Sequence, residues 1–274
     1  MGVASTLLVA VSAMNAGALG AEEPPASASA ASAQRQVLLV SEARGFVHDS
    51  IPAAVAVFED LGRRSTRYDV VHLRDGTRAL TPARLRRADG VIFANTSGEL
   101  PFSAAQRSAL LSFVRRGGGV VATHSAADAF LGTWPAYGRL LGARFERHDR
   151  PRTQRVVIED RRHPATRGLG GSLRIFEEFY EFQPGPDPRR VAHVLARLDT
   201  GANGADRPLV WCRREGRGRV FYDALGHFRA TWRDRRHRRL VAGGVAWSLG
   251  LTPGACAPPA ASTEAFKPPP SRSG

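Results

Sequence analysis

Short apolar runs alternate with helix-like segments over residues 37–123, and this alternation leaves few folds open to the chain. The predicted strands are Val37–Val40, Tyr68–Leu73, Gly90–Ala94 and Val120–Thr123. The first run is apolar throughout, as expected of a strand covered on both faces. Strands that alternate with helices form a parallel sheet with right-handed crossovers, so we predict an α/β fold.

Helix signals separate these strands. Pro52 lies in the first turn of a helix predicted from Ser50 to Leu61, and Thr81-Pro82 opens a shorter one. Ser103 and Gln106 form a capping box for a helix that ends at the glycine triplet 117–119.

The pattern beyond residue 150 is richer in strands. We predict strands at Arg155–Glu159, Val191–Leu198, Leu209–Arg213 and Arg219–Leu225, and a closing helix at Arg235–Leu249. The pattern does not distinguish parallel from antiparallel pairing in this part.

The chain is strongly basic, with 39 Lys and Arg against 25 Asp and Glu and a formal net charge of +14. Such a charge suggests a polyanion partner. However, the arginines are scattered except for one run at 233–239, and no nucleic-acid recognition motif accompanies them. We therefore do not expect a nucleic-acid partner, and interpret the run as the solvated face of the closing helix.

Both ends of the chain differ in composition from the middle. Residues 1–21 resemble a signal peptide without a basic start, 22–35 form an Ala/Ser linker, and 251–274 are expected to form a disordered Pro-rich tail. We expect a folded domain at 36–250, no stable membrane span, and a periplasmic or extracellular location.

The two cysteines, Cys212 and Cys256, exclude a zinc finger, an iron–sulfur cluster and a disulfide framework. Because Cys256 falls in the predicted tail, we do not expect the two to pair.

Polar side chains follow several of the predicted strands. His48 follows the first strand, Asn95 the third and His124 the fourth. Ligands of parallel sheets bind beyond the carboxyl ends of the strands, and a strand order of 2-1-3-4 makes these loops neighbours. His227 ends a later strand, and either reaches the same cleft or only forms a turn.

Each histidine has a functional and a structural interpretation. His48 and His124 are metal ligands or general bases, or else a helix-cap partner and a satisfied core histidine. Ser125 is a weak candidate nucleophile because no glycine flanks it. The other histidines, including His148, look structural or superficial.

Residues 174–182, RIFEEFYEF, place Phe176, Glu178, Tyr180 and Phe182 on one face if the run is a single strand. A carboxylate on an aromatic face is costly unless it is paired or binds a metal. Glu178 is therefore a candidate acid/base or ligand, with an arginine partner as the alternative.

Several segments together resemble the ThuA-like, or trehalose-utilisation, family. They are GFVHDSIP (45–52), GGGVVATHSAAD (117–128), WPAYGRLLGARFERH (134–148), HPAT (163–166), EEFYEF (177–182) and GRVFYDALGH (218–227). The resemblance implies a flavodoxin-like, class I glutamine amidotransferase-like fold, a three-layer α/β/α sandwich with a mostly parallel sheet.

The resemblance also implies a role in the metabolism of trehalose or oxidised (keto) sugars. Amidotransferases have a cysteine after the fourth strand, where this chain has Thr123-His124-Ser125, so cysteine-dependent amide hydrolysis is excluded. The family commonly has Asp-Glu-Trp-Tyr where this chain has Glu177-Glu178-Phe179-Tyr180.

The leading hypothesis is a metal-assisted enzyme (a hydrolase, lyase or isomerase) acting on a small saccharide or keto-sugar. His48, His124 and His227 would bind a divalent ion, zinc above all, while Glu178 moves protons and Asp128 orients a ligand. The residues expected to contact the sugar are Asn95, Trp134, Tyr137 and Tyr180. The alternative is an exported module that binds a saccharide without turning it over. The oligomeric state stays open.

Overall fold

The computed structural model describes residues 1–2, 34–183, 187–201 and 204–257. The predicted signal peptide and nearly all of the linker, and the end of the predicted tail, lie outside the described residues. Within the described residues, no helix combines the length and the apolar character needed to cross a bilayer.

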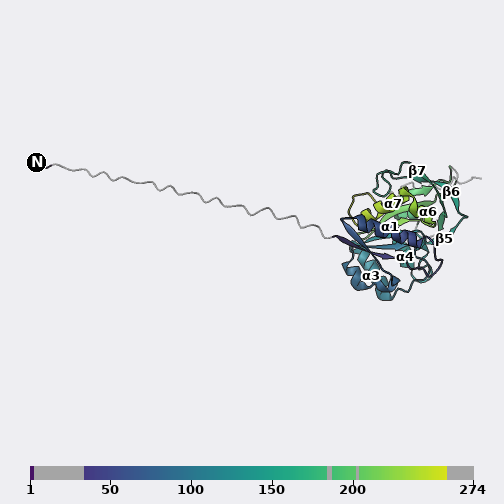
Figure 1. The fold of residues 1–274 in the computed structure, drawn as a ribbon, viewed down its shortest axis with the longest axis horizontal. Coiled ribbons are helices and arrows are strands. Elements are labelled where there is room, and N and C mark those ends of the chain that lie inside the picture. The colour runs from purple at the N-terminus through teal and green to yellow at the C-terminus, as the bar shows by residue number, and fades with distance from the viewer. Residues whose placement is uncertain (3–33, 184–186, 202–203, 258–274) are drawn as a thin grey trace, which may run out of the picture. The chain divides into compact units, whose positions relative to one another are not determined.

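A sheet forms the centre of the domain (Figure 1). It has nine strands in the order β2-β1-β3-β4-β11-β10-β9-β6-β7. Its strands are β1 (Arg35–Val40), β2 (Tyr68–His72), β3 (Gly90–Ala94), β4 (Gly119–Thr123), β6 (Arg152–Ile158), β7 (Ser172–Glu177), β9 (His193–Leu198), β10 (Pro208–Glu215) and β11 (Gly218–Asp223). A separate two-stranded sheet pairs β5 (Phe145–His148) with β8 (Tyr180–Phe182).

The pairing direction changes at one place in the large sheet. From β2 to β11 the neighbouring strands are parallel, and from β11 to β7 they are antiparallel. The order 2-1-3-4, on which the expected neighbourhood of the loops depended, is therefore present. In the second half of the chain, where the sequence left the direction open, β11 is parallel to β4 and the remaining pairs are antiparallel. The parallel part carries the fully buried runs β3 and β4, as crossover helices on both faces require.

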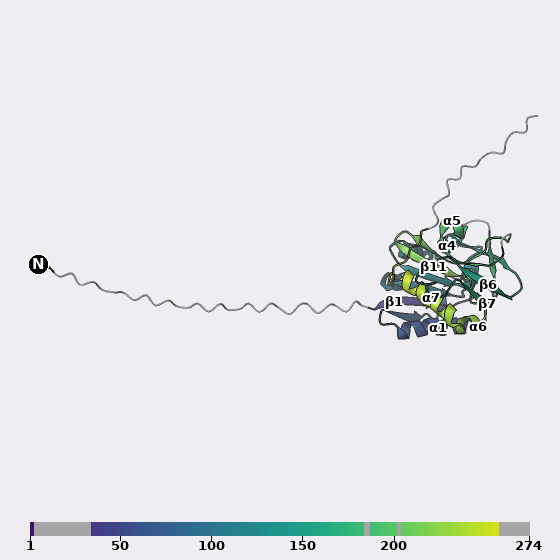
Figure 2. The same cartoon turned by 90° about the horizontal axis from the view of Figure 1, so that it is seen from above.

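Helices cover the two faces of the sheet and complete the predicted α/β/α sandwich. They are α1 (Ile51–Arg64), α2 (Pro82–Arg87), α3 (Ala104–Arg115), α4 (Pro135–Leu141), α5 (Pro188–Val191), α6 (Arg229–Arg233) and α7 (Arg235–Ser248). Figure 1 shows α1, α6 and α7 grouped together, with α3 and α4 away from them; Figure 2 shows the same separation of α4 from α1 and α7. Two 3₁₀ helices, η1 (Gly76–Ala79) and η2 (His124–Asp128), lie in the loops.

The predicted helix caps are present. Ser103 Oγ accepts the backbone N–H of Gln106 while Gln106 Oε1 accepts that of Ser103, which is a complete capping box. Thr81 caps α2 through the N–H of Arg84.

The arginine run 233–239 lies at the junction of α6 and α7. Arg236 forms an ion pair with Asp234, and Arg238 with Asp60. These contacts favour the interpretation as a solvated helix face over a polyanion site.

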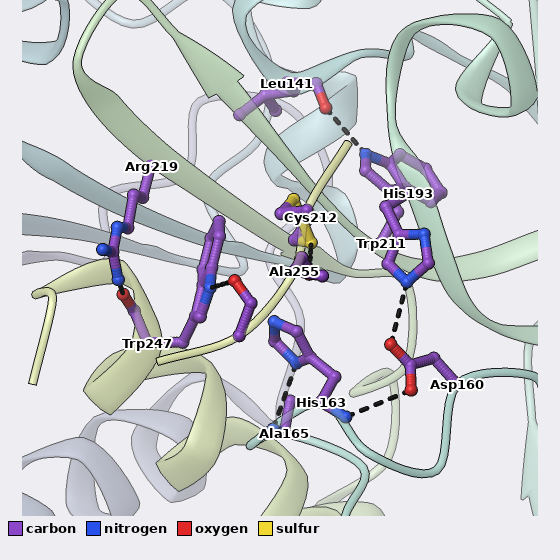
Figure 3. The surroundings of a disulfide bond; sticks show 12 residues. Leu141, Asp160, His163, Ala165, His193, Trp211, Cys212, Arg219, Trp247 and Ala255 are labelled. Atoms are coloured by element: carbon purple, nitrogen blue, oxygen red, sulfur yellow. Dashed lines mark hydrogen bonds and ion pairs between the residues drawn. A yellow bond between two sulfur atoms is a disulfide. The ribbon is translucent and has the colours of Figure 1, made fainter. Parts of the chain in front are cut away.

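The chain after α7 folds back onto the sheet, as Figure 3 shows. Trp247 donates its indole N–H to the carbonyl of Gly254 at 3.1 Å, and Cys256 is buried beside Cys212 of β10. The two cysteines form a disulfide with Cα atoms 5.8 Å apart. The expectation that they stay unpaired is wrong, because residues 251–257 pack on the domain despite their Pro/Ala composition.

Candidate functional site

Four loops meet at the carboxyl edge of the parallel strands. His48 follows β1, Asn95 follows β3, His124 follows β4 and His227 follows β11. Since these strands are neighbours in the sheet, their loops lie side by side. The prediction that the first three loops are neighbours is confirmed, and His227 joins them.

Three histidines and one glutamate form a compact cluster there. One ligand atom from each of His48, His124, Glu178 and His227 lies within 4.8 Å of all the others. His124 Nε2 is 3.1 Å from His48 Nε2 and 3.3 Å from His227 Nδ1. Glu178 Oε2 is 2.9 Å from His227 Nδ1 and 3.8 Å from His124 Nε2. The cluster can hold a metal ion.

The tautomer of His124 follows from its backbone contact. Its Nδ1 lies 2.9 Å from the carbonyl oxygen of Ala224, which only accepts, so Nδ1 carries the proton. Nε2 therefore turns a lone pair toward the cluster. That single lone pair has three close neighbours, since Tyr180 Oη is also 3.0 Å away.

The electrostatics of the cluster keep two imidazoles neutral. Burial, reinforced by the charge of His227, lowers the pKa of His48 to about 4. Burial and the nearby His48 hold the pKa of His124 well below its usual range. Burial acts in the same direction on His227, but the hydrogen bond and charge of Glu178 outweigh it and raise the pKa of His227. Neutral imidazole is the form that binds metals.

The spacing of the ligand atoms fits a small divalent cation. Ligand atoms about 2.0–2.1 Å from a tetrahedral zinc ion lie about 3.3 Å from one another. The distances of 3.1 Å and 3.3 Å from His124 Nε2 to the other two imidazoles agree with this value. A nitrogen-rich set of ligands suits zinc and its neighbours in the transition series.

Outer contacts hold the cluster residues in place. Ser125 Oγ is 3.3 Å from His48 Nδ1, and His148 Nδ1 is 3.2 Å from Glu178 Oε1. His148, expected to be structural or to lie at the surface, instead lies against the candidate carboxylate. It arrives there through the pairing of β5 with β8, where His148 is opposite Tyr180.

Glu177 is a second buried carboxylate behind the cluster. It accepts the backbone N–H groups of Gly226 at 3.0 Å and His227 at 3.3 Å, and the hydroxyl of Thr231. Burial raises its pKa, although these donors favour the charged form. Sequence reasoning missed this role; the only signal was a second carboxylate beside Glu178.

The backbone of the His124 loop is strained. His124 has a φ of 47° and Asn95 a φ of 48°, both in the left-handed region that side chains other than glycine rarely adopt. Contacts hold each residue in this conformation. For His124, the contact is the hydrogen bond of its ring to the Ala224 carbonyl. Strain of this kind is concentrated at functional sites.

Asn95 ties the loops together and has no free polar group for a sugar. Its side-chain N–H groups donate to Ser50 Oγ at 3.1 Å and to the Gly226 carbonyl at 2.8 Å, and its oxygen accepts the Thr123 hydroxyl at 2.8 Å. It is completely buried. The expected contact with a sugar therefore does not fit Asn95.

Trp134 and Tyr137 are not among the clustered residues. Both are buried in an aromatic group with Phe130, whose ring centroid is 5.1 Å from Trp134 and 4.9 Å from Tyr137. Their faces are occupied by neighbouring rings, so the expected sugar-stacking role does not fit them. Tyr180 does lie at the cluster, but it is buried and offers its hydroxyl to His124 rather than an open ring.

Asp128 ends η2 and is not one of the four clustered residues. Burial raises the pKa of its carboxyl, and the backbone N–H of Gly98 acts against this. Asp128 thus faces the Gly98 loop, and its expected role in orienting a ligand remains a prediction.

The segment 174–182 is two strands rather than one. β7 ends at Glu177 and β8 begins at Tyr180, with Glu178 and Phe179 between them. The break turns Glu178 into the cluster, whereas Phe176 stays 51% exposed at the surface. The condition of a single strand is therefore not met, and Glu178 joins the cluster from the break between the two strands.

Similarity to known proteins supports the fold. No curated protein is significantly similar to this chain in sequence. A ThuA-like protein from Bacteroides uniformis has a TM-score of 0.67 and 24% identity, covering 81% of this chain and 94% of that one. A ThuA-like protein from Parabacteroides merdae has a TM-score of 0.64 and 19% identity, covering 79% and 90%.

A more distant neighbour is part of a larger enzyme. A β-galactosidase from Rahnella has a TM-score of 0.52 and 16% identity, and the match covers 80% of this chain but 32% of that one. At these identities the structures agree in fold alone. The family profile described as trehalose utilisation, however, matches residues 36–248, nearly all of the described domain. The chain therefore belongs to the ThuA family.

Proposed function

We propose that this ThuA-like protein is a metal-dependent enzyme that acts on a saccharide or keto-sugar. The observation that carries the proposal is the surroundings of His124 Nε2. One lone pair faces two imidazole nitrogens and a tyrosine hydroxyl at 3.0–3.3 Å. A hydrogen-bond network satisfies this arrangement only in part, because His227 Nδ1 donates to Glu178 at 2.9 Å while His48 and Tyr180 share the one lone pair of His124. A shared cation would instead bind the lone pairs of all three imidazoles.

His48, His124 and His227 would hold the ion, and zinc suits their three nitrogens best. A zinc ion supplies Lewis acidity to a carbonyl or hydroxyl oxygen of the ligand. The contacts of Ser125 with His48 and of Ala224 with His124 fix the two rings, as contacts to the outer nitrogens do in metal sites.

Glu178 is the proposed proton acceptor. One of its oxygens faces His227 and the other faces His148, so the carboxylate is held at the edge of the cluster while 6% of the residue stays exposed. A carboxylate in this position is suited to remove a proton from carbon next to a sugar carbonyl. Such a reaction is a lyase or isomerase step; the same constellation also serves a hydrolase.

Glutaminase activity is not part of the proposal. The loop after β4 carries His124 and Ser125 where an amidotransferase needs a cysteine, and both cysteines are joined in the disulfide. Export to the periplasm or the exterior is part of it, because disulfides persist in oxidising compartments and residues 1–21 resemble a signal peptide.

The experiment that tests the proposal measures bound metal and turnover together. Protein purified without a histidine tag is analysed by elemental mass spectrometry beside His48→Ala and His124→Asn, since asparagine tolerates the left-handed backbone at this position. His193→Ala is the matched control, because His193 is a half-buried histidine that pairs with Asp160 instead. Trehalose and a keto-disaccharide are then incubated with each protein, and products are identified by mass spectrometry.

We expect about one ion per chain in the parent and in His193→Ala, little in the two cluster variants, and product only from the metal-loaded proteins. A parent protein that binds neither added zinc nor added manganese would contradict the metal mechanism. A parent that binds metal and sugar but releases no product would favour the non-catalytic binding module.

A further inference from the structure

Large apolar side chains that remain exposed gather beside the cluster. Among the described residues, those exposed by more than a third are Met1, Phe46, Val47, Val71 and Phe176. Phe46 and Val47 directly precede His48, and Phe176 lies two residues before Glu178. Three of these five residues therefore lie within two positions of a cluster residue in the sequence.

Two phenyl rings, Phe46 and the less exposed Phe228, are in contact with cluster imidazoles, and Phe176 packs on Phe228. The Phe46 ring centroid is 4.7 Å from that of His48 and 6.3 Å from that of His227, nearly parallel to the latter. Phe228 is 4.5 Å from His227, and Phe176 is 5.0 Å from Phe228. We call Phe46, Phe176 and Phe228 the aromatic rim.

The exposure of Phe46 is built into the fold. The hydroxyl of Ser97 donates to the Phe46 carbonyl at 2.8 Å, and the Ser97 carbonyl accepts the N–H of Arg44 at 2.8 Å. Ser97 thus holds the backbone of the loop at Arg44 and at Phe46, while Phe46 itself remains 65% exposed. An exposed phenyl ring is unfavourable in water, so a ligand that covers Phe46 would be favoured by the burial of this ring.

The residues beside the aromatic rim restrict the chemical class of that ligand. The rim is a few rings wide, too small for a stable protein interface, and it adjoins a buried carboxylate and three imidazoles. A suitable ligand has a flat apolar face together with polar oxygens at its edge. A pyranose ring has both, with C–H groups on its faces and hydroxyl or carbonyl oxygens around it.

We propose that the aromatic rim is the stacking face for the sugar rings of the ligand, with Phe46 on one side of His227 and Phe228 and Phe176 following from it, and with the oxygens of those rings directed to the cluster. Phe46 and Phe176 take the place that sequence reasoning gave to Trp134 and Tyr137. The inference rests on the proposed function for the class of ligand, but it assigns residues that the metal mechanism does not use.

The test measures the affinity for trehalose by isothermal titration calorimetry with the zinc-loaded chain. Phe46→Ala and Phe176→Ala remove one ring each, Phe46→Leu keeps apolar volume without a flat face, and Phe46→Tyr keeps the ring. Val71→Ala on β2 is the matched control, an exposed apolar residue away from the cluster. Zinc content and oligomeric mass are measured for every protein.

We expect Phe46→Ala, Phe46→Leu and Phe176→Ala to bind trehalose about threefold to tenfold more weakly, as the loss of an aromatic contact implies. Phe46→Tyr and Val71→Ala should match the parent, and zinc should be unchanged in all.

Unchanged affinity in Phe46→Ala would overturn the inference and leave the proposed function standing. So would dissociation of an oligomer in Phe46→Ala, because the rim would then be a contact between copies. A zinc-loaded parent that binds neither trehalose nor a keto-disaccharide would overturn the proposed sugar ligand and the stacking face with it.

Discussion

Glu177 accepts the backbone N–H of His227 at 3.3 Å, so a buried carboxylate positions one of the three clustered imidazoles. The same carboxylate accepts the N–H of Gly226, in the loop after β11, and the hydroxyl of Thr231, in α6. It therefore connects that loop to α6. It also accepts the N–H of Glu178 at 3.0 Å. Two cluster residues, from β11 and from the β7–β8 junction, thus depend on one side chain.

Replacement of Glu177 should therefore loosen the metal site without removing a ligand. In Glu177→Ala the buried N–H groups of Gly226 and His227 lose their acceptor, which costs about 2–4 kcal/mol of unfolding free energy. We expect zinc affinity to fall about 10- to 100-fold, as when an outer contact of a metal site is lost. Chemical denaturation and zinc titration with a competing chelator measure the two effects.

The matched control for this change is Glu159→Ala. Glu159 is a partly exposed carboxylate that pairs with Arg189 and Arg197, so its loss should change stability by less than about 1 kcal/mol. Its zinc affinity should equal that of the parent. Equal zinc affinity in Glu177→Ala would instead show that Glu177 does not position the ligands.

The Cys212–Cys256 disulfide should stabilise the domain by about 2–4 kcal/mol, because it closes a long loop in the unfolded chain. We expect Cys256→Ser to unfold at a lower denaturant concentration than the parent. A thiol reductant should destabilise the parent to the level of this variant and leave the variant unchanged. If the reductant has no effect on the parent, the bond does not contribute to stability.

His163 should make the fold sensitive to acid. Burial lowers its pKa from 6.5 to about 4, while its Nδ1 accepts the N–H of Ala165 and its ring packs on Trp247. Between pH 6.5 and 4, His163 is protonated in the unfolded chain but not in the folded chain. The free energy of unfolding therefore falls as the pH falls. The full loss below pH 4 is about 3 kcal/mol.

His163→Asn tests this effect, because the asparagine oxygen still accepts the Ala165 N–H but does not titrate. Unfolding free energies of both proteins are measured at several values from pH 7 to pH 4. We expect the variant to be the less stable protein at pH 7 and to lose less stability on acidification. Parallel pH curves would assign the acid sensitivity to other groups.

The fold was largely predictable because its signals are local. The capping box at Ser103 and Gln106 and the buried run Val37–Val40 each depend on a few neighbouring residues. The parallel order then followed from the length of the crossovers. For β10 and β11 a local signal was missed, because Gly216-Arg217 is the two-residue turn of a hairpin. The direction of β9 was not predictable, because its pairings with β10 and β6 join segments that no such turn connects.

The candidate site was predictable only where its residues follow strands. His48 and His124 were found by their position at the edge of the sheet. His148 was missed because it reaches Glu178 through the pairing of β5 with β8, a contact between distant segments. Trp134 was misplaced for the opposite reason, since an aromatic residue near a predicted site is equally suited to the core.

Zinc itself should stabilise the fold. An ion that binds only the folded chain adds about 2.7 kcal/mol at a free concentration 100-fold above its dissociation constant. For a domain of this size, that gain raises the melting temperature by about 5–10 °C. We expect the rise in the parent and in His193→Ala, and its reversal by a chelator. His48→Ala lacks one of the clustered nitrogens, so its melting temperature should respond far less. An equal rise in His48→Ala would place the bound zinc elsewhere on the protein, and the cluster would then be no more than a buried group of polar side chains.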